Sequence, residues 1–257
     1  MSTPYQVVPV RAFKDNYIWV LRAGRNAAVV DPGEAAPVLD YLAAEGLDLV
    51  AILLTHHHRD HVGGVGTLIA SHRIPVTGPK NEPIEHLTRK VSEGDRIEVP
   101  EIGASFEVLD IPGHTRAHIA YYGEKRLFCG DTLFACGCGR VFEGTPEQMF
   151  GSLQKLAALP DDTLIYCAHE YTLANIAFAR TVEPGNEALA QAERAAKELR
   201  ARGEPTVPST LAREKATNPF LRCADQAIID SINKHLDAQI VQPAQAFAAI
   251  REWKNRF

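Results

Sequence analysis

The segment Thr55-His56-His57-His58-Arg59-Asp60-His61-Val62-Gly63-Gly64 decides how this chain is interpreted. It ends the apolar run Leu49–Thr55, which is typical of a strand buried on both faces. On an extended chain alternate side chains point the same way, so His56 and His58 can converge on one metal ion. Asp60 and His61 follow where a helix is expected to begin, and they point elsewhere. They could therefore bind a second ion beside the first.

The ligand types in this segment favour a catalytic metal site. A structural zinc ion is usually enclosed by four ligands, often cysteines, whereas imidazoles with a carboxylate suit a site that keeps an open position for water. The alternative is that these polar rings pack in the core without a metal, which would be costly for so many polar groups. We therefore predict metal binding by residues 56–61, with His57 pointing away from the metal.

Three other fragments can complete such a site, because each follows an expected strand. They are Gly113-His114-Thr115, Gly130-Asp131-Thr132 and His169-Glu170-Tyr171. Strand ends are where loops gather side chains at one edge of a sheet. Each fragment alone would be weak evidence, since a lone His or Asp there is more often a turn residue. The complete set suits two ions that share Asp131 as a bridge: His56, His58, Asp60, His61, His114, Asp131 and His169.

The rest of the chain indicates a mixed α/β domain at residues 1–172 and a helical domain at 173–257. Strands are expected at Gln6–Val10, Tyr17–Arg22, Ala27–Val30, Ser105–Ile111, His118–Tyr122, Arg126–Cys129 and Thr163–Cys167. Helices are expected at Glu34–Glu45, Pro146–Ala158, Asn186–Arg202, Ala224–His235 and Pro243–Lys254. Thr145 is the expected N-cap of the second helix, with Pro146 at its first position.

Composition narrows the class of protein. The formal net charge of −5 provides no basic field, which argues against a dedicated nucleic-acid binder. No cationic start precedes an apolar run, and no window approaches the ~18–20 apolar residues of a spanning helix, so neither a signal peptide nor a membrane partner is expected. Five cysteines without CxxC spacing indicate reduced thiols in a cytoplasmic protein. We interpret Cys136 and Cys138 as small buried side chains of a tight loop, in preference to metal ligands.

The order of T-H-H-H-R-D-H, G-H-T, G-D-T-L-F and H-E-Y-T resembles the metallo-β-lactamase superfamily. Further motifs are similar to its hydroxyacylglutathione hydrolase (glyoxalase II) branch: A-C-G-C-G-R at 135–140, F-E-G-T at 142–145, V-E-P-G-N at 182–186, P-T-V-P-S at 205–209 and N-P-F-L-R at 218–222. The resemblance covers nearly the whole chain. It implies an αββα sandwich that carries two metal ions, followed by a helical domain that helps to hold glutathione.

The resemblance also implies a role for each site residue. His56, His58 and His114 would bind one ion, Asp60, His61 and His169 the other, and Asp131 would lie between them. Glutathione would contact Arg140, Tyr171, Arg251 and Lys254. From the sequence alone, Arg251 and Lys254 would be taken for a solvated helix face, and only the resemblance favours binding. Phe142 stands where some members have Tyr, and Ala117 where a Gly is common, so substrate affinity could differ.

The activity implied is hydrolysis of S-(2-hydroxyacyl)glutathione, such as S-lactoylglutathione, the second step of methylglyoxal detoxification. Two divalent ions would lower the pKa of a bridging water, and the resulting hydroxide would attack the thioester carbonyl. Asp60 and Asp131 are the expected catalytic residues, with Asp60 orienting the water. Zinc is our first choice of metal, although iron or manganese would accept the same ligands. A monomer acting on a small-molecule thioester is expected.

Three alternatives remain open at this point. A β-lactamase or lactonase of the same superfamily is disfavoured by the absence of a secretion signal and by the helical tail. A di-iron oxidoreductase would be expected to carry a carboxylate at the position of His58, and usually a flavin module for which the chain has no room. A non-catalytic metal-binding or scaffold protein would bind metal tightly without turnover.

Overall fold

The computed structural model describes residues 5–70 and 73–257. The described residues form two compact units. Unit 1 contains the described residues up to Asp110 together with Thr115–Gly130, and unit 2 contains Ile111–His114 together with Asp131–Phe257. The domain boundary at residue 172 stays a prediction.

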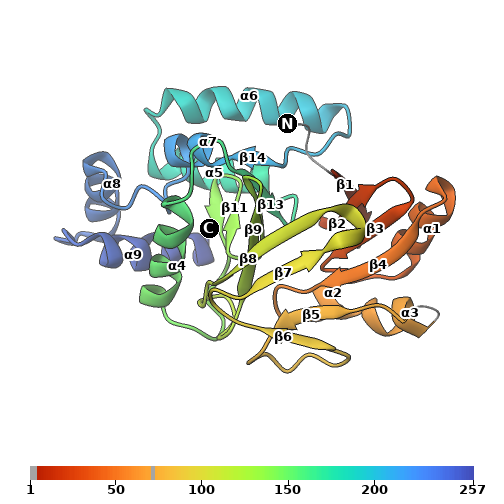
Figure 1. The fold of residues 1–257 in the computed structure, drawn as a ribbon. Coiled ribbons are helices and arrows are strands. Elements are labelled where there is room, and N and C mark those ends of the chain that lie inside the picture. The colour runs from red at the N-terminus through yellow and green to blue at the C-terminus, as the bar shows by residue number, and fades with distance from the viewer. Residues whose placement is uncertain (1–4, 71–72) are drawn as a thin grey trace. The chain divides into compact units, whose positions relative to one another are not determined.

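Unit 1 begins with a six-stranded sheet whose strands lie side by side in the same order as in the sequence (Figure 1). Its strands are β1 (Gln6–Ala12), β2 (Asn16–Ala23), β3 (Asn26–Val30), β4 (Asp48–Leu53), β5 (Val76–Pro79) and β6 (Arg89–Val91). The first three pair antiparallel and the last three extend the sheet in parallel. Helix α1 (Ala36–Glu45) connects β3 to its parallel neighbour β4, as a parallel pair requires.

Both faces of this sheet are covered within unit 1. Val38 and Leu42 of α1 and Leu68 of α3 (Val65–Ala70) pack in one apolar core with alternate residues of the strands, among them Ile18 and Val20 of β2. The intervening residues of β2 point to the opposite face and are buried as well. The sheet is therefore an inner layer, which explains the near-continuous apolar character of its strands.

A second, antiparallel sheet lies in unit 1. Its strands β7 (Arg96–Val99), β8 (Ala104–Asp110), β9 (Ile119–Gly123) and β10 (Arg126–Gly130) are in the order β10-β9-β8-β7, with the short 3-10 helix η1 (Pro100–Ile102) after β7. The buried Tyr121 hydroxyl donates to the Leu54 carbonyl at 2.8 Å. The Ile119 N–H donates to the Thr55 carbonyl at 3.0 Å. These bonds fix the segment that leaves β4 against the second sheet.

Unit 2 is mainly helical (Figure 1). It contains the hairpin β11 (Leu133–Phe134) and β12 (Gly137–Cys138), the pair β13 (Leu164–Cys167) and β14 (Ser209–Thr210), and the helices α4 (Pro146–Ala157), α5 (Thr172–Val182), α6 (Glu187–Ala201), α7 (Leu211–Thr217), α8 (Gln226–Leu236) and α9 (Pro243–Arg256). Ile176 and Ala179 of α5 pack with Leu189 and Ala196 of α6. The predicted combination of mixed α/β structure with a helical C-terminal region is confirmed.

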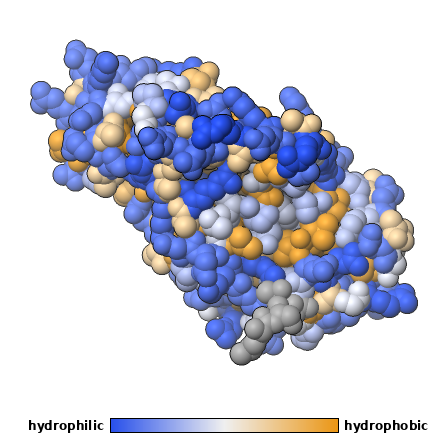
Figure 2. All heavy atoms as spheres, turned by 90° about the horizontal axis from the view of Figure 1, so that it is seen from above, coloured by the Kyte–Doolittle hydropathy of each residue, from blue (hydrophilic) through white to orange (hydrophobic). Residues whose placement is uncertain are grey.

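The structure differs from the predicted elements in places. Helix α1 begins at Ala36, two residues later than expected. Glu34 lies before the helix, and its carboxylate accepts the backbone N–H of Phe13 at 2.6 Å. Helices α5 and α7 were not predicted. On the face seen in Figure 2, hydrophilic residues cover most of the surface. In residues 5–70 and 73–257 no helix is both long and apolar enough to cross a membrane.

The predicted N-cap of α4 gives a first testable consequence. The Thr145 side chain accepts the N–H of Gln148, and the Gln148 side chain accepts the N–H of Thr145, which forms a capping box. We expect Thr145→Ala to lower the free energy of unfolding by about 1 kcal/mol, since the Gln148 N–H loses its acceptor, the Thr145 hydroxyl. Urea denaturation measures this. Thr181→Ala, on an exposed helix face, is the control, and equal stability of the two variants would contradict the assignment.

Candidate functional site

Unit 1 holds four of the predicted ligands in the segment that follows β4, and buried Asp31 anchors that segment. The Thr55 N–H and hydroxyl donate to the two Asp31 carboxylate oxygens at 2.8 and 2.7 Å. Because the single hydroxyl proton is used there, His56 Nδ1 must donate to Thr55 Oγ1, 3.0 Å away. His61 Nδ1 likewise donates to Asp31 Oδ2 at 3.1 Å. Both rings therefore carry their protons on Nδ1 and present Nε2 to a cation.

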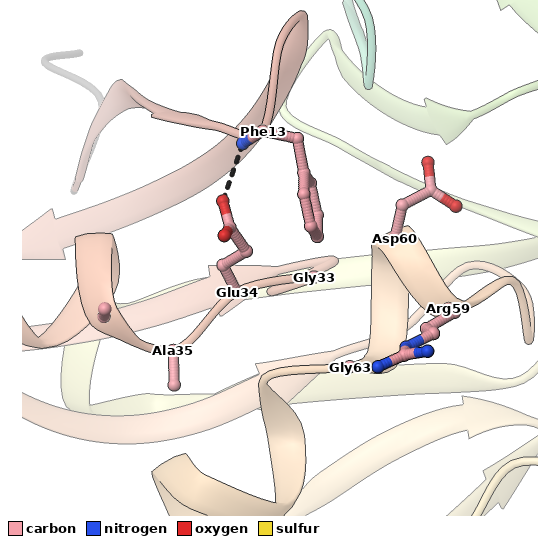
Figure 3. Close-up of a pocket in the computed structure, with 8 residues that line it drawn as sticks. Phe13, Gly33, Glu34, Ala35, Arg59, Asp60 and Gly63 are labelled. Atoms are coloured by element: carbon pink, nitrogen blue, oxygen red, sulfur yellow. Dashed lines mark hydrogen bonds between the residues drawn. The ribbon is translucent and has the colours of Figure 1, made fainter.

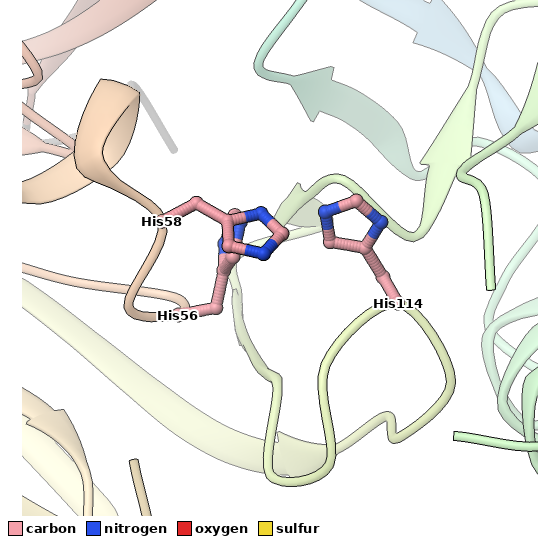
Figure 4. Close-up of side chains that lie close together, drawn as sticks. All are labelled: His56, His58 and His114. Atoms are coloured by element: carbon pink, nitrogen blue, oxygen red, sulfur yellow. The ribbon is translucent and has the colours of Figure 1, made fainter. Parts of the chain in front are cut away.

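His58 and Asp60 lie beside these two rings. The His56 and His58 ring centroids are 4.7 Å apart, and those of His56 and His61 are 4.0 Å apart; Figure 4 shows the first pair. Helix α2 (Arg59–Val62) starts directly after His58 and places Asp60 Oδ2 3.5 Å from His61 Nε2. Buried Asn16 donates to the same carboxylate oxygen at 3.0 Å, which orients it. The local sequence thus gathers three imidazoles and a carboxylate within one unit.

Two further histidines, His57 and His118, lie beside this cluster. The His57 ring centroid is 5.0 Å from that of His58, and His57 Nδ1 pairs with the buried Glu82 carboxylate; that His57 points away from the metal stays a prediction. Glu82 also accepts the Thr115 hydroxyl at 2.6 Å and the Ala117 N–H at 3.0 Å. His118 is fully buried and stacks on His56 with a centroid separation of 4.5 Å. Glu82 gave no sequence signal, since a lone carboxylate in a polar loop is ordinarily solvated.

Unit 2 holds the other three predicted ligands. His114 Nε2 lies 3.4 Å from Asp131 Oδ2, and His169 Nε2 lies 3.3 Å from Asp131 Oδ1. His114 Nδ1 donates to the Arg140 carbonyl at 2.8 Å, which leaves Nε2 facing the carboxylate. One carboxylate therefore faces two imidazoles, with one oxygen toward each. This is the arrangement expected of a carboxylate that could bridge two cations.

The donors of the two units fit divalent metal ions. They are neutral imidazole nitrogens and carboxylate oxygens, the ligand types that zinc, iron and manganese accept. In unit 1, one ligand-type atom of each of Asp31, His56 and His61 lies within 4.8 Å of the others, and Asp31 accepts hydrogen bonds from Thr55 and His61 that orient the cluster. Each unit thus carries a His/Asp cluster that could bind metal.

A cavity of about 410 Å³ lies within unit 2, and its lining includes two of the predicted metal ligands, His114 and Asp131. It also brings together all four of the predicted glutathione contacts. Its lining is His114, Asp131, Phe134, Cys138, Gly139, Arg140, Phe142, Tyr171, Ala174, Asn175, Arg251 and Lys254. The Tyr171 ring stacks on His169 with centroids 4.7 Å apart. Three cationic side chains in one cavity favour an anionic ligand.

Arg251 and Lys254 are part of the cavity wall. Arg251 is only 5% exposed, and its Nη1 donates to the Cys138 carbonyl at 2.8 Å, which excludes the solvated helix face for this residue. The Lys254 ammonium donates to Asn175 Oδ1 and lies over the rings of Phe178 and Phe220. Burial, and then the positive charge of Arg251, lower the pKa of Lys254 to about 8.

Asn175 and Cys138 also line this cavity, and Cys136 lies near Cys138 in the hairpin. Asn175 was missed by the sequence interpretation; it is a buried amide that also donates to the Ala135 carbonyl at 3.0 Å. Cys136 and Cys138 are buried in the β11–β12 hairpin, as expected of a tight loop. Burial raises the pKa of Cys136 to about 12 and also raises that of Cys138. Both stay protonated near neutral pH, which disfavours them as metal ligands.

A second, more open cavity of about 530 Å³ lies in unit 1 and includes Asp60 in its lining (Figure 3). Phe13 extends into it, with 54% of the residue exposed and a left-handed φ of 48°. Glu34 holds this turn through the Phe13 N–H. Arg59 is its one cationic side chain, so it lacks the concentration of positive charge found in unit 2.

Two family models together match residues 12–257 of this chain. Residues 12–169 match the metallo-beta-lactamase superfamily, and residues 170–257 match the hydroxyacylglutathione hydrolase C-terminus. The hydroxyacylglutathione hydrolase of Nitrosomonas eutropha is 56% identical, over 98% of both chains. This chain belongs to the hydroxyacylglutathione hydrolase family. The enzyme of that name from Vibrio parahaemolyticus is 52% identical over 98% of this chain and 99% of its own.

Solved structures share the fold of this chain. The crystal structure of ETHE1 from Myxococcus xanthus aligns with a TM-score of 0.64 and 26% identity, covering 97% of this chain and 99% of its own. TTHA1623 in a di-iron-bound form aligns with a TM-score of 0.60 and 27% identity, covering 83% and 99%. The predicted metallo-β-lactamase-like fold is confirmed.

Proposed function

We propose that this hydroxyacylglutathione hydrolase family member cleaves S-(2-hydroxyacyl)glutathione thioesters, such as S-lactoylglutathione, to glutathione and a 2-hydroxy acid. The observation that carries the proposal lies within unit 2. There, Asp131 and His114 line the same cavity as Arg140, Arg251 and Lys254. An anionic thioester bound in this cavity would therefore lie beside His114 and Asp131, two of the residues proposed to hold the metal ions.

Seven residues are proposed to hold two divalent ions: His56, His58, Asp60, His61, His114, Asp131 and His169. The ions would supply a hydroxide near neutral pH and polarise the thioester carbonyl. Asp131 offers one oxygen to each of two imidazoles, and Asp60, whose carboxylate accepts a hydrogen bond from Asn16, would orient the attacking water. Zinc is the proposed metal, with iron or manganese as alternatives; the di-iron form of TTHA1623 shows iron in a related fold.

The cavity supplies recognition. The carboxylates of glutathione need guanidinium or ammonium partners, which Arg140, Lys254 and Arg251 provide in a partly desolvated wall. Tyr171 lies at the mouth, where it is 37% exposed. The leaving group is a thiol of pKa about 8.5, so it departs as a thiolate with little help from an acid. The chain accordingly needs no protonated carboxyl beside the thioester sulfur.

Three further points are proposals that rest on the same family resemblance and composition. The chain acts as a monomer in the cytoplasm on a small-molecule thioester, with neither nucleic acid nor membrane as a partner. Residues 1–172 form the metal-binding domain and residues 173–257 the glutathione-binding domain. This activity would serve as the second step of methylglyoxal detoxification.

The function is tested by following S-lactoylglutathione hydrolysis by the purified chain before and after chelation. We expect turnover that falls at least about tenfold on metal removal and returns when zinc is added back, because the hydroxide depends on the ions. Nitrocefin, assayed in parallel, should stay intact. Nitrocefin cleavage without thioester cleavage would favour a β-lactamase, and tight metal binding without turnover on either would indicate a non-catalytic protein.

A further inference from the structure

The hairpin β11–β12 forms one wall of the cavity in unit 2. It contributes Phe134 and Cys138 to the lining and continues into Gly139 and Arg140, which also line the cavity. Its tip includes Cys136 at a left-handed φ of 55°, a conformation that a residue with a side chain adopts only when its surroundings impose it. The path of this short segment therefore sets the shape of the binding wall.

Two side chains of the α7 region, Glu214 and Asn218, bind the hairpin backbone through hydrogen bonds. Asn218 Nδ2 donates to the carbonyls of Phe134 and Gly137, at 3.1 and 2.9 Å. Glu214 Oε2 accepts the Cys136 N–H at 2.7 Å. The two side chains also contact each other, since Asn218 Nδ2 lies 3.2 Å from Glu214 Oε2. One amide and one carboxylate thus bind both strands and the tip of the hairpin.

Neither side chain lines the cavity, and both are completely buried. Burial raises the pKa of the Glu214 carboxyl, while hydrogen bonds from Ser209, the Cys136 N–H and Asn218 oppose that rise. A buried carboxyl group is costly for stability alone, because an apolar residue of similar volume would fill the same space without desolvating polar oxygens. Its position against a strained N–H suggests a role in fixing the hairpin.

We propose that Glu214 and Asn218 are positioning residues that set the affinity for the glutathione portion of the substrate by fixing the β11–β12 backbone. The inference deepens the proposed function and rests on it. The effect passes to the ligand through two cationic side chains: Arg251, whose Nη1 donates to the Cys138 carbonyl at 2.8 Å, and Arg140, which follows the hairpin and lines the same cavity. A shift of the hairpin would therefore also move Arg140 and Arg251.

The decisive variant is Asn218→Asp. It keeps the size of the side chain and the acceptor that receives the Phe220 N–H at 3.1 Å, but it replaces the donor with an oxygen that faces the Phe134 and Gly137 carbonyls. We expect KM for S-lactoylglutathione to rise about fivefold with kcat within about twofold, because binding is affected and the reacting groups are not. Hydrogen exchange of residues 133–140 should accelerate in the same variant.

The matched control is Asn233→Asp in α8 of the same unit. It keeps the acceptor that receives the Ile240 N–H at 2.7 Å but loses the donor to the Ile240 carbonyl at 2.9 Å, and neither bond involves α7 or the hairpin. We expect it to lower Tm without changing KM. An Asn218→Asp variant that lowers Tm but leaves KM and the exchange of residues 133–140 unchanged overturns the inference.

A second variant covers the case in which Asn218→Asp does not fold. Glu214→Met keeps a similar side-chain length but removes the oxygen that accepts the Cys136 N–H at 2.7 Å, and we expect it to raise KM about threefold; an unchanged KM overturns the inference. If the wild-type chain hydrolyses no thioester, the proposed function fails. In that case hydrogen exchange of residues 133–140 still decides whether Glu214 and Asn218 fix the β11–β12 backbone, because exchange must accelerate in these variants if they do.

Discussion

Asp131→Ala is expected to lower kcat/KM for S-lactoylglutathione at least about a thousandfold, equivalent to about 4 kcal/mol of transition-state stabilisation. Each Asp131 oxygen faces a different imidazole, His114 at 3.4 Å and His169 at 3.3 Å. Removing the carboxylate would leave both sides of the proposed two-ion centre without their common anion. Metal content, measured on the purified protein by elemental analysis, should fall from about two to about one ion or fewer per chain.

Two variants separate this effect from a general loss of structure. Asp131→Asn keeps the size of the side chain but lacks the charge, and we expect it to lose metal and turnover in the same direction. Asp161→Ala removes an exposed carboxylate paired with Lys215 and should leave both unchanged. The two-ion proposal is wrong if Asp131→Ala retains both its metal content and its turnover.

The part of the site that was predictable from the sequence is the part encoded locally. Residues 56–61 follow directly from a buried strand, and alternation along an extended chain is enough to bring His56 and His58 together. Helix α4 was likewise predictable, because Thr145 and Pro146 are local start signals. Asp131 was found for the same reason, since it follows a recognisable strand.

The missed features depend on distant partners or lack periodicity. Asn175 meets Lys254 across 79 positions of the chain, and Glu214 meets Cys136 across 78, so no local pattern connects them. Helix α5 was missed because it is buried on several sides and includes β-branched residues that weaken a helical pattern. Helix α7 has seven residues, too few for an apolar stripe to be recognised.

The second large effect, on substrate binding, depends on the three cationic side chains of the cavity in unit 2: Arg140, Arg251 and Lys254. Lys254→Met should raise KM at least about 30-fold at pH 7 with little change in kcat, because a carboxylate in a partly desolvated cavity would lose its ammonium partner. Steady-state kinetics measures the separation of KM from kcat. Lys197→Met is the control, since Lys197 is an exposed residue that pairs with Glu193, and its KM should match that of the wild type.

The pH dependence of binding distinguishes Lys254 from any other cation in the wall. Its pKa is lowered from the ordinary 10.5 to about 8 by burial and by the charge of Arg251. The ammonium therefore loses its proton as the pH rises above about 8, and KM of the wild type should begin to rise there. Lys254→Arg keeps a charge that does not titrate in this range, so its KM should stay flat to higher pH. A KM that rises identically in wild type and Lys254→Arg would show that another group binds the carboxylate.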